Sequence, residues 1–160
     1  MCPNKKSTVL FLSHDASRTG APIVFLNLLT WIKNNTDLNF EILLRNGGDL
    51  ECEFAKVKKF EIFDHKQSSF SSYSCTIQGL KSFLKHKWKA IFGNKEHDLI
   101  DKYKKDGVGL IYSNTITNGA ILEYLSDLNC PVITHVHELE NYIESCGKEN
   151  FILVKKYTSL

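Results

Sequence analysis

The chain has 160 residues, the length of a single domain that buries about 70% of the surface exposed by its unfolded chain. Its hydrophobic and charged fractions, 42% and 24%, are those of a globular protein, and a net charge of +2 is too small to indicate nucleic acid as a partner. The five cysteines are odd in number and widely spaced, without a C-x-x-C motif, which predicts reduced thiols in a cytoplasmic protein rather than a disulfide framework.

The first predicted elements are a buried strand over 9–12, a polar loop over 13–20 and a helix that begins at Ala21-Pro22. The helical residues at turn spacing are Ile23, Leu26, Asn27 and Trp31. A helix N-terminus beyond a strand offers free N–H groups to an anion. The loop has one glycine, however, and matches neither G-x-G-x-x-G nor the P-loop motif. It therefore indicates either an ordinary turn or an anion site.

Strands and helices alternate along the rest of the chain. The sequence predicts strands over 40–44, 109–112 and 131–136, and the alternation of polar and apolar residues predicts another over 59–63. The helical patterns predict helices over 50–57, 76–92, 96–105, 117–128, 139–145 and 150–157, with a serine-rich loop over 67–74. This alternation is typical of βαβ units. We therefore expect one α/β, Rossmann-like domain of three layers, with a mainly parallel sheet.

The predicted helix over 76–92 is basic and amphipathic. Residues 75–95 contain five lysines and no acidic residue, and Trp88 lies on the apolar face. Such a helix suits the surface of an anionic membrane, or it is a solvated lysine face over a packed stripe. The N-terminus lacks the apolar core of a signal peptide, and no apolar run reaches the ~18 residues of a spanning helix. We expect a cytoplasmic protein, peripheral on the inner membrane face if this helix binds lipid.

Three loops that leave strands carry polar residues: 13–20, 113–118 and 135–140. In a parallel sheet, ligands bind beyond the carboxyl ends of the strands. We therefore expect all three loops to lie at one edge.

Two histidines, His135 and His137, end the last predicted strand, and alternation along that strand would point them to opposite faces. The following sequence is not H-E-x-x-H, because Asn141 occupies the second histidine position, so we expect no metal site. His137 with Glu138 and Glu140 indicates acid–base chemistry or recognition of sugar hydroxyls. The alternative is a strand-end histidine bonded to the backbone.

Three blocks of the sequence resemble the N-terminal half of the family 4 (group 1) glycosyltransferases. They are VLFLSHDASRTGAPIVFLNLL, IYSNTITNGAILEYLSDLNCPVITHVHELE and GKENFILVKKYTSL, and the match is weakest between Arg45 and Gly107. The resemblance implies half of a GT-B architecture, in which the N-terminal domain holds the acceptor and a C-terminal domain holds the nucleotide-sugar. The chain stops where relatives enter the last strand of the first domain. We expect residues 1–160 to be a single N-terminal domain, incomplete at its C-terminus and without the donor-binding domain.

The resemblance also implies roles for individual residues. It places His137 beside the transferred sugar, as the catalytic residue, and Gly20 near the donor diphosphate. Thr19 and Arg18 flank that glycine, and Arg18 would meet the diphosphate or an anionic acceptor. The residues expected to bind substrate hydroxyls are Asn114, Thr115, Asn118 and Glu138.

Retaining transfer in the family needs no metal, so the expected ligands are a nucleotide-sugar donor and a glycan or lipid-linked acceptor, with no further cofactor. Two other readings stay open. The chain could be a non-catalytic remnant that acts as a binding or membrane-surface module through 76–92. It could also be an unrelated nucleotide-binding domain, which the absence of G-x-G-x-x-G disfavours.

Overall fold

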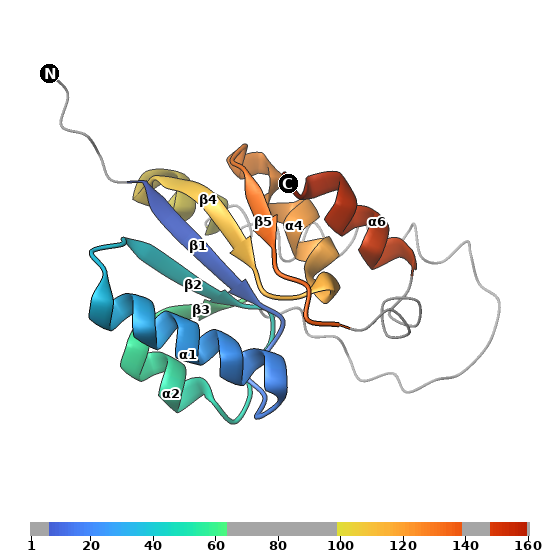
Figure 1. Ribbon diagram of the computed structural model, residues 1–160. Coiled ribbons are helices and arrows are strands. Elements are labelled where there is room, and N and C mark those ends of the chain that lie inside the picture. Colours follow the sequence, from blue (N-terminus) through green and yellow to red (C-terminus); the bar gives the residue numbers. More distant parts are fainter. Residues whose placement is uncertain (1–6, 64–98, 139–147, 160) are drawn as a thin grey trace, which may run out of the picture.

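The computed structural model describes residues 7–63, 99–138 and 148–159. They form an α/β domain whose five strands make one open, all-parallel sheet in the order β3-β2-β1-β4-β5 (Figure 1). The strands are β1 (Thr8–Ser13), β2 (Phe40–Leu44), β3 (Phe60–Ile62), β4 (Val108–Ser113) and β5 (Val132–Thr134). This confirms the expected α/β class with a parallel sheet, and the arrangement is compatible with a Rossmann-like domain.

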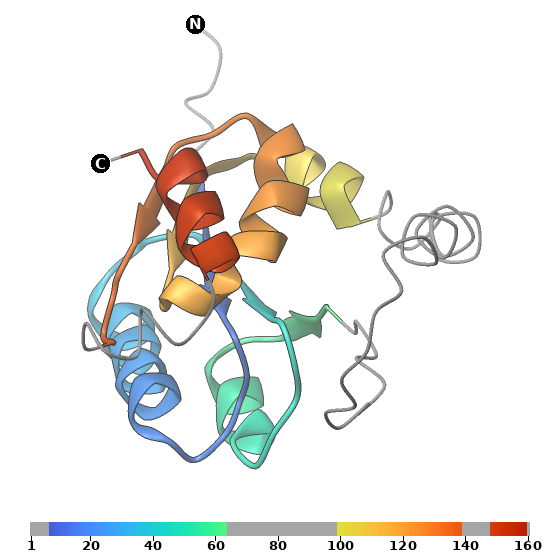
Figure 2. The same ribbon diagram turned by 90° about the vertical axis from the view of Figure 1, so that its right-hand side faces the viewer.

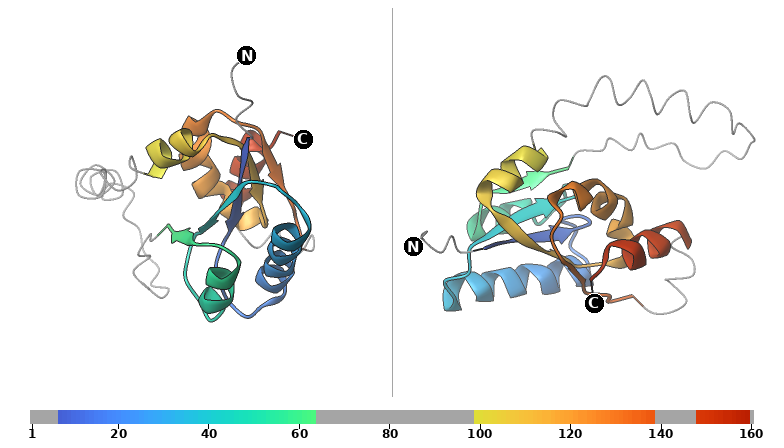
Figure 3. Two further views of the ribbon diagram at one scale, coloured as in Figure 1. Left: turned by 90° about the vertical axis from the view of Figure 1, so that its left-hand side faces the viewer. Right: turned by 90° about the horizontal axis from the view of Figure 1, so that it is seen from above.

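Helices cover both faces of the sheet. Figures 2 and 3 show α1 (Gly20–Asn35) and α2 (Glu51–Val57) on one face, and α4 (Gly119–Leu125) and α6 (Lys148–Tyr157) on the other. Two short 3₁₀ turns, η1 (Ile116–Asn118) and η2 (Ser126–Leu128), flank α4, and residues 99–106 are also helical. Among the described helices, none combines the length and apolar character that crossing a membrane requires. The predicted loop over 67–74 and the predicted helices over 76–92 and 139–145 lie outside the described residues.

The central strand β1 separates two hydrophobic cores. All six of its residues are buried. Leu10 and Leu12 belong to the core under α4 and α6, whereas Val9 and Phe11 belong to the core under α1 and α2. This division follows from the alternation of side chains along a strand, and it explains why a strand covered on both faces is a continuous apolar run.

The stripe of α1 that contains Ile23 and Trp31, at the turn spacing noted in the sequence, does not face the sheet. Ile23 and Trp31 are 38% and 59% exposed, whereas Phe25 and Leu29 are fully buried. The helix carries two apolar stripes at turn spacing, and the sequence periodicity does not rank them. The aromatic ring of Phe11 on β1 packs 6.1 Å from that of Phe25, so the second stripe faces the sheet.

The helices α4 and α6 lie side by side, and Gly119 at the start of α4 permits their close approach (Figure 2). A Cβ atom at position 119 would lie 2.7 Å from the carbonyl oxygen of Asn150 and 3.0 Å from the Cβ of Leu153. The segment that leads from β4 into α4 is therefore supported by α6.

Candidate functional site

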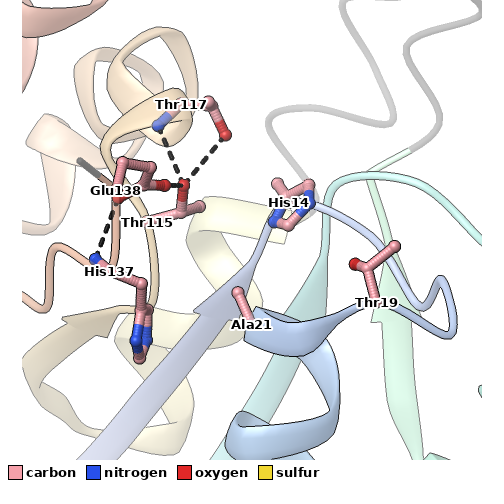
Figure 4. Close-up of a pocket in the computed structure, with 7 residues that line it drawn as sticks. All are labelled: His14, Thr19, Ala21, Thr115, Thr117, His137 and Glu138. Carbon is pink, nitrogen blue, oxygen red and sulfur yellow. Dashed lines mark hydrogen bonds between the residues drawn. The ribbon is translucent and has the colours of Figure 1, made fainter. Parts of the chain in front are cut away.

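A pocket of about 330 Å³ opens at the carboxyl edge of the sheet (Figure 4). Its lining residues come from the loops after β1, β4 and β5: His14, Thr19, Ala21, Thr115, Thr117, His137 and Glu138. The sequence predicted that these three loops would share one edge, and the described parts of the loops do so. The pocket is therefore built from three segments that lie far apart in the chain.

The loop after β1 forms the wall of the pocket nearest α1. Asp15 shapes this loop, because its Oδ1 accepts hydrogen bonds from the backbone N–H of Ser17 at 3.0 Å and from its hydroxyl at 2.8 Å. Thr19 precedes α1 in an extended conformation, and its side chain does not cap the helix. At Gly20, an added Cβ would meet no atom within 4 Å. The N-terminus of α1 thus begins between two lining residues, with space beside it.

Asn114 joins the other two walls from behind the pocket. Its side chain is buried at the end of β4. The amide nitrogen Nδ2 donates to the carbonyl oxygen of Ala21 at 3.1 Å, and Oδ1 lies 2.8 Å from Nε2 of His137. One side chain therefore connects the start of α1 with the histidine after β5.

Glu138 ties the loop after β5 to the loop after β4. One carboxylate oxygen accepts hydrogen bonds from the hydroxyl of Thr115 and from the backbone N–H of Ile116, the latter at 3.3 Å. The other accepts from the backbone N–H of His137 at 3.0 Å. Because both oxygens already have donors, Glu138 serves to hold the pocket wall together.

The sequence predicted that His135 and His137 would point to opposite faces, and this prediction is wrong. Their ring centroids lie 3.9 Å apart and their planes differ by 36°. Alternation holds only within a strand, and β5 ends at Thr134 rather than at Val136. Residues 135–138 leave the strand without regular structure, which lets both imidazoles stack on the same side.

Burial and charge lower the pKa of His137. Burial is the larger cause, the charge of a protonated His135 adds to it, and the Glu138 carboxylate opposes it. Among the described residues that line the pocket there is no lysine or arginine. The lining thus combines threonine hydroxyls and imidazoles with one carboxylate and the small Ala21 side chain, a composition that suits a ligand rich in hydroxyl groups.

Two residues predicted to bind ligands lie elsewhere. Arg18 is largely exposed and pairs with Glu53 of α2 at 3.0 Å, outside the pocket lining. Asn118 is fully buried and donates from Nδ2 to the hydroxyl of Ser113 at 3.0 Å. Of the other predicted residues, Thr19, Thr115, His137 and Glu138 line the pocket, Gly20 lies between two lining residues and Asn114 lies behind them.

The sequence reasoning missed His14 and Thr117 as individual site residues. His14 directly follows β1, and its Nε2 lies 3.3 Å from Oδ2 of Asp15, while its buried Nδ1 has no hydrogen-bond partner among the described residues. The sequence feature that could have identified His14 is its position immediately after a predicted buried strand. The hydroxyl of Thr117 shares a hydrogen bond of 3.2 Å with that of Thr115. In the described parts of the chain, no three histidine, cysteine or acidic side chains are grouped as metal ligands would be.

The fold and the pocket together define an α/β domain of parallel strands with a polar site at the carboxyl edge of its sheet. Comparison of the chain with protein-family models, curated proteins and solved structures found no match.

Proposed function

We propose that this chain is the acceptor-side domain of a retaining glycosyltransferase of GT-B fold, which transfers a sugar from a nucleotide-sugar to a glycan or lipid-linked acceptor. The observation that carries the proposal is the meeting of three segments at one pocket. HDASRTGAP and the loops that follow β4 and β5 belong to the blocks that resemble family 4 glycosyltransferases, and their residues line that pocket.

The chemistry of the lining supports a sugar as ligand. Sugar hydroxyls both donate and accept hydrogen bonds, and so do the threonine hydroxyls and the neutral imidazole of His137 in the pocket. Proteins bind phosphate with cationic side chains or with the backbone N–H groups of a helix N-terminus, and Arg18 is already paired with Glu53. Within the described residues, the backbone N–H groups at the start of α1 beside Gly20 are therefore the feature best suited to the donor diphosphate.

In the proposed reaction, this chain acts mainly by positioning the reacting groups. The Asn114 side chain and the Glu138 carboxylate hold His137 in place from two sides. A fixed imidazole beside the transferred sugar would orient it toward the acceptor, and the helix N-terminus would stabilise the charge that develops on the leaving diphosphate. The remaining donor-binding groups would come from a second domain, so we expect the 160-residue chain alone to transfer little or no sugar.

Saturation-transfer NMR with a panel of monosaccharides and nucleotide-sugars tests the proposal on the chain as it stands. We expect sugar protons to receive saturation, and His137→Ala to weaken binding about tenfold, the loss of one good hydrogen bond. Thr117→Val and Thr30→Val form a matched pair, because each removes one hydroxyl, and Thr30 lies exposed on α1 away from the lining.

Of the two threonine substitutions, only Thr117→Val should weaken sugar binding. Two results would contradict the proposal. One is sugar binding by both threonine variants and by His137→Ala that equals that of the wild type, and the other is saturation transfer to the nucleotide protons without transfer to sugar protons.

A further inference from the structure

The ring of His135 is held by contacts on two sides. Its Nδ1 lies 2.7 Å from the hydroxyl oxygen of Tyr112 on β4, and its ring stacks on that of His137. Tyr112 is itself fixed, because its ring packs 5.4 Å from that of Phe11 in the core under α1. The stacking partner of His137 is therefore anchored to the sheet.

The hydrogen bonds of Asn114 determine which nitrogen of His137 carries a proton. A backbone carbonyl only accepts, so the Asn114 group that faces the carbonyl of Ala21 must be the amide NH₂. The amide oxygen then faces His137, and it accepts a hydrogen bond from Nε2–H. In the neutral ring, the lone pair is consequently on Nδ1.

We propose that His135 is a positioning residue for His137. Through its stacked ring and its bond to Tyr112, it keeps His137 a neutral imidazole whose Nδ1 accepts a hydrogen bond from a ligand hydroxyl. The ligand part of this inference rests on the proposed function, whereas the state of the two rings does not.

The charges around the pair explain why His137 is the ring that stays neutral. The Tyr112 hydroxyl can accept as well as donate, so it can hydrogen-bond Nδ1 of His135 in either role. A second proton, on His137, would place two cations with ring centroids 3.9 Å apart.

The other groups that face His137 do little to favour the second proton. Asn114 is neutral, the start of α1 is the positive end of a helix, and His14 lines the opposite wall of the pocket. Among the described residues, Glu138 is the group that favours a positive charge on His137. Its oxygens already accept hydrogen bonds from three donors.

The charge of the His137 ring determines which kind of ligand it favours. A neutral His137 offers an acceptor to a hydroxyl, whereas a protonated His137 offers only donors and would favour an anion. Sugar binding should therefore weaken as the pH falls through the pKa of His137, which lies below its ordinary value of 6.5.

Long-range ¹H–¹⁵N NMR of the imidazole rings, without any ligand, tests the state of the pair, with the signals of His137 assigned from His137→Gln. We expect the Nε2–H tautomer at neutral pH and a titration midpoint below 6.5. His135→Phe keeps a stacked ring but removes its charge, so the midpoint of His137 should move upward while the tautomer is retained.

Tyr112→Phe is a second variant that keeps the packed ring and removes only the hydroxyl, and it should change the ¹⁵N shifts of His135 without changing the tautomer of His137. An Nδ1–H tautomer, or a midpoint unmoved by His135→Phe in a folded protein, would overturn the inference.

The pH dependence of saccharide binding separates this inference from the proposed function. In the wild type, saccharide affinity should fall about tenfold as His137 gains its proton, and in His135→Phe the fall should begin at higher pH. If no saccharide binds but the rings titrate as described, the proposed function is wrong and the assignment of the pair holds. Saccharide affinity that does not change across this range would overturn the role of Nδ1 as acceptor.

Discussion

The hydroxyl of Thr115 donates a hydrogen bond to a carboxylate oxygen of Glu138, 23 residues further along the chain, and so joins the loops after β4 and β5. The same carboxylate accepts backbone N–H groups from both loops. A carboxylate that accepts from several donors stabilises the conformation that presents them. The geometry of the pocket therefore depends on the charge state and shape of one side chain.

Glu138→Gln should lower the free energy of unfolding by about 1–3 kcal/mol, because glutamine replaces one acceptor oxygen with an NH₂ group that faces a donor. Urea denaturation followed by circular dichroism measures the change. Glu53→Gln is the control, since the pair of Glu53 with Arg18 is largely exposed and should contribute less than about 1 kcal/mol. An equal loss in both variants would show that the Glu138 contacts add nothing particular to the fold.

Tyr103→Phe should leave the stability unchanged or raise it by about 1 kcal/mol, because the Tyr103 ring is fully buried and its hydroxyl has no hydrogen-bond partner among the described residues. Thermal unfolding detects the shift. Tyr157→Phe is the matched control, since the Tyr157 hydroxyl is exposed and reaches Glu123 at 3.4 Å. A clear loss of stability in Tyr103→Phe would mean that the hydroxyl has a partner after all.

The stability of the domain should depend on pH through His137. Its folded-state pKa is lower than the ordinary 6.5 of the unfolded chain, so the unfolded state binds more protons between these two values. The contribution of His137 is therefore complete above pH 6.5 and is lost as the pH falls through the folded-state pKa.

Urea denaturation at a series of pH values from 7.5 to 5 would show this loss, with the wild type and His137→Gln compared at each pH. A wild-type curve no steeper than that of the variant would contradict it.

Gly20→Ala and Gly48→Ala should have opposite effects on stability. A Cβ at position 48 would lie 2.5 Å from the carbonyl oxygen of Ala16, so the loop after β1 must shift, at a cost of about 1–3 kcal/mol. A Cβ at position 20 meets no atom within 4 Å, and alanine at a helix start should stabilise by up to about 1 kcal/mol.

If a diphosphate approaches the start of α1, Gly20→Ala should nevertheless weaken nucleotide-sugar binding. Titration calorimetry, with a second GT-B domain supplied where one is identified, measures that loss. Unchanged donor affinity would remove Gly20 from the proposed site.

The sequence predicts the sheet well because its signals are local. Apolar runs such as Phe40–Leu44 predict buried strands, and parallel strands bring the loops after them to one edge. The stacking of His135 on His137 could not be predicted, because it depends on where β5 ends, and a strand of three residues leaves little pattern. The orientation of the Arg18 side chain depends on its ion pair with Glu53. That partner lies 35 residues away, so no local sequence pattern reveals it.

The close approach of α4 to α6 at Gly119 has a consequence for the order in which the protein assembles during translation. The first half of the sheet, from β1 to β3, and the core under α1 and α2 come mainly from residues 8–62 and can begin to pack while the ribosome is still adding residues. The wall of the pocket that contains Thr115 lacks its support until α6 has been synthesised. The pocket is therefore a late product of synthesis, and it takes shape after most of the surrounding fold.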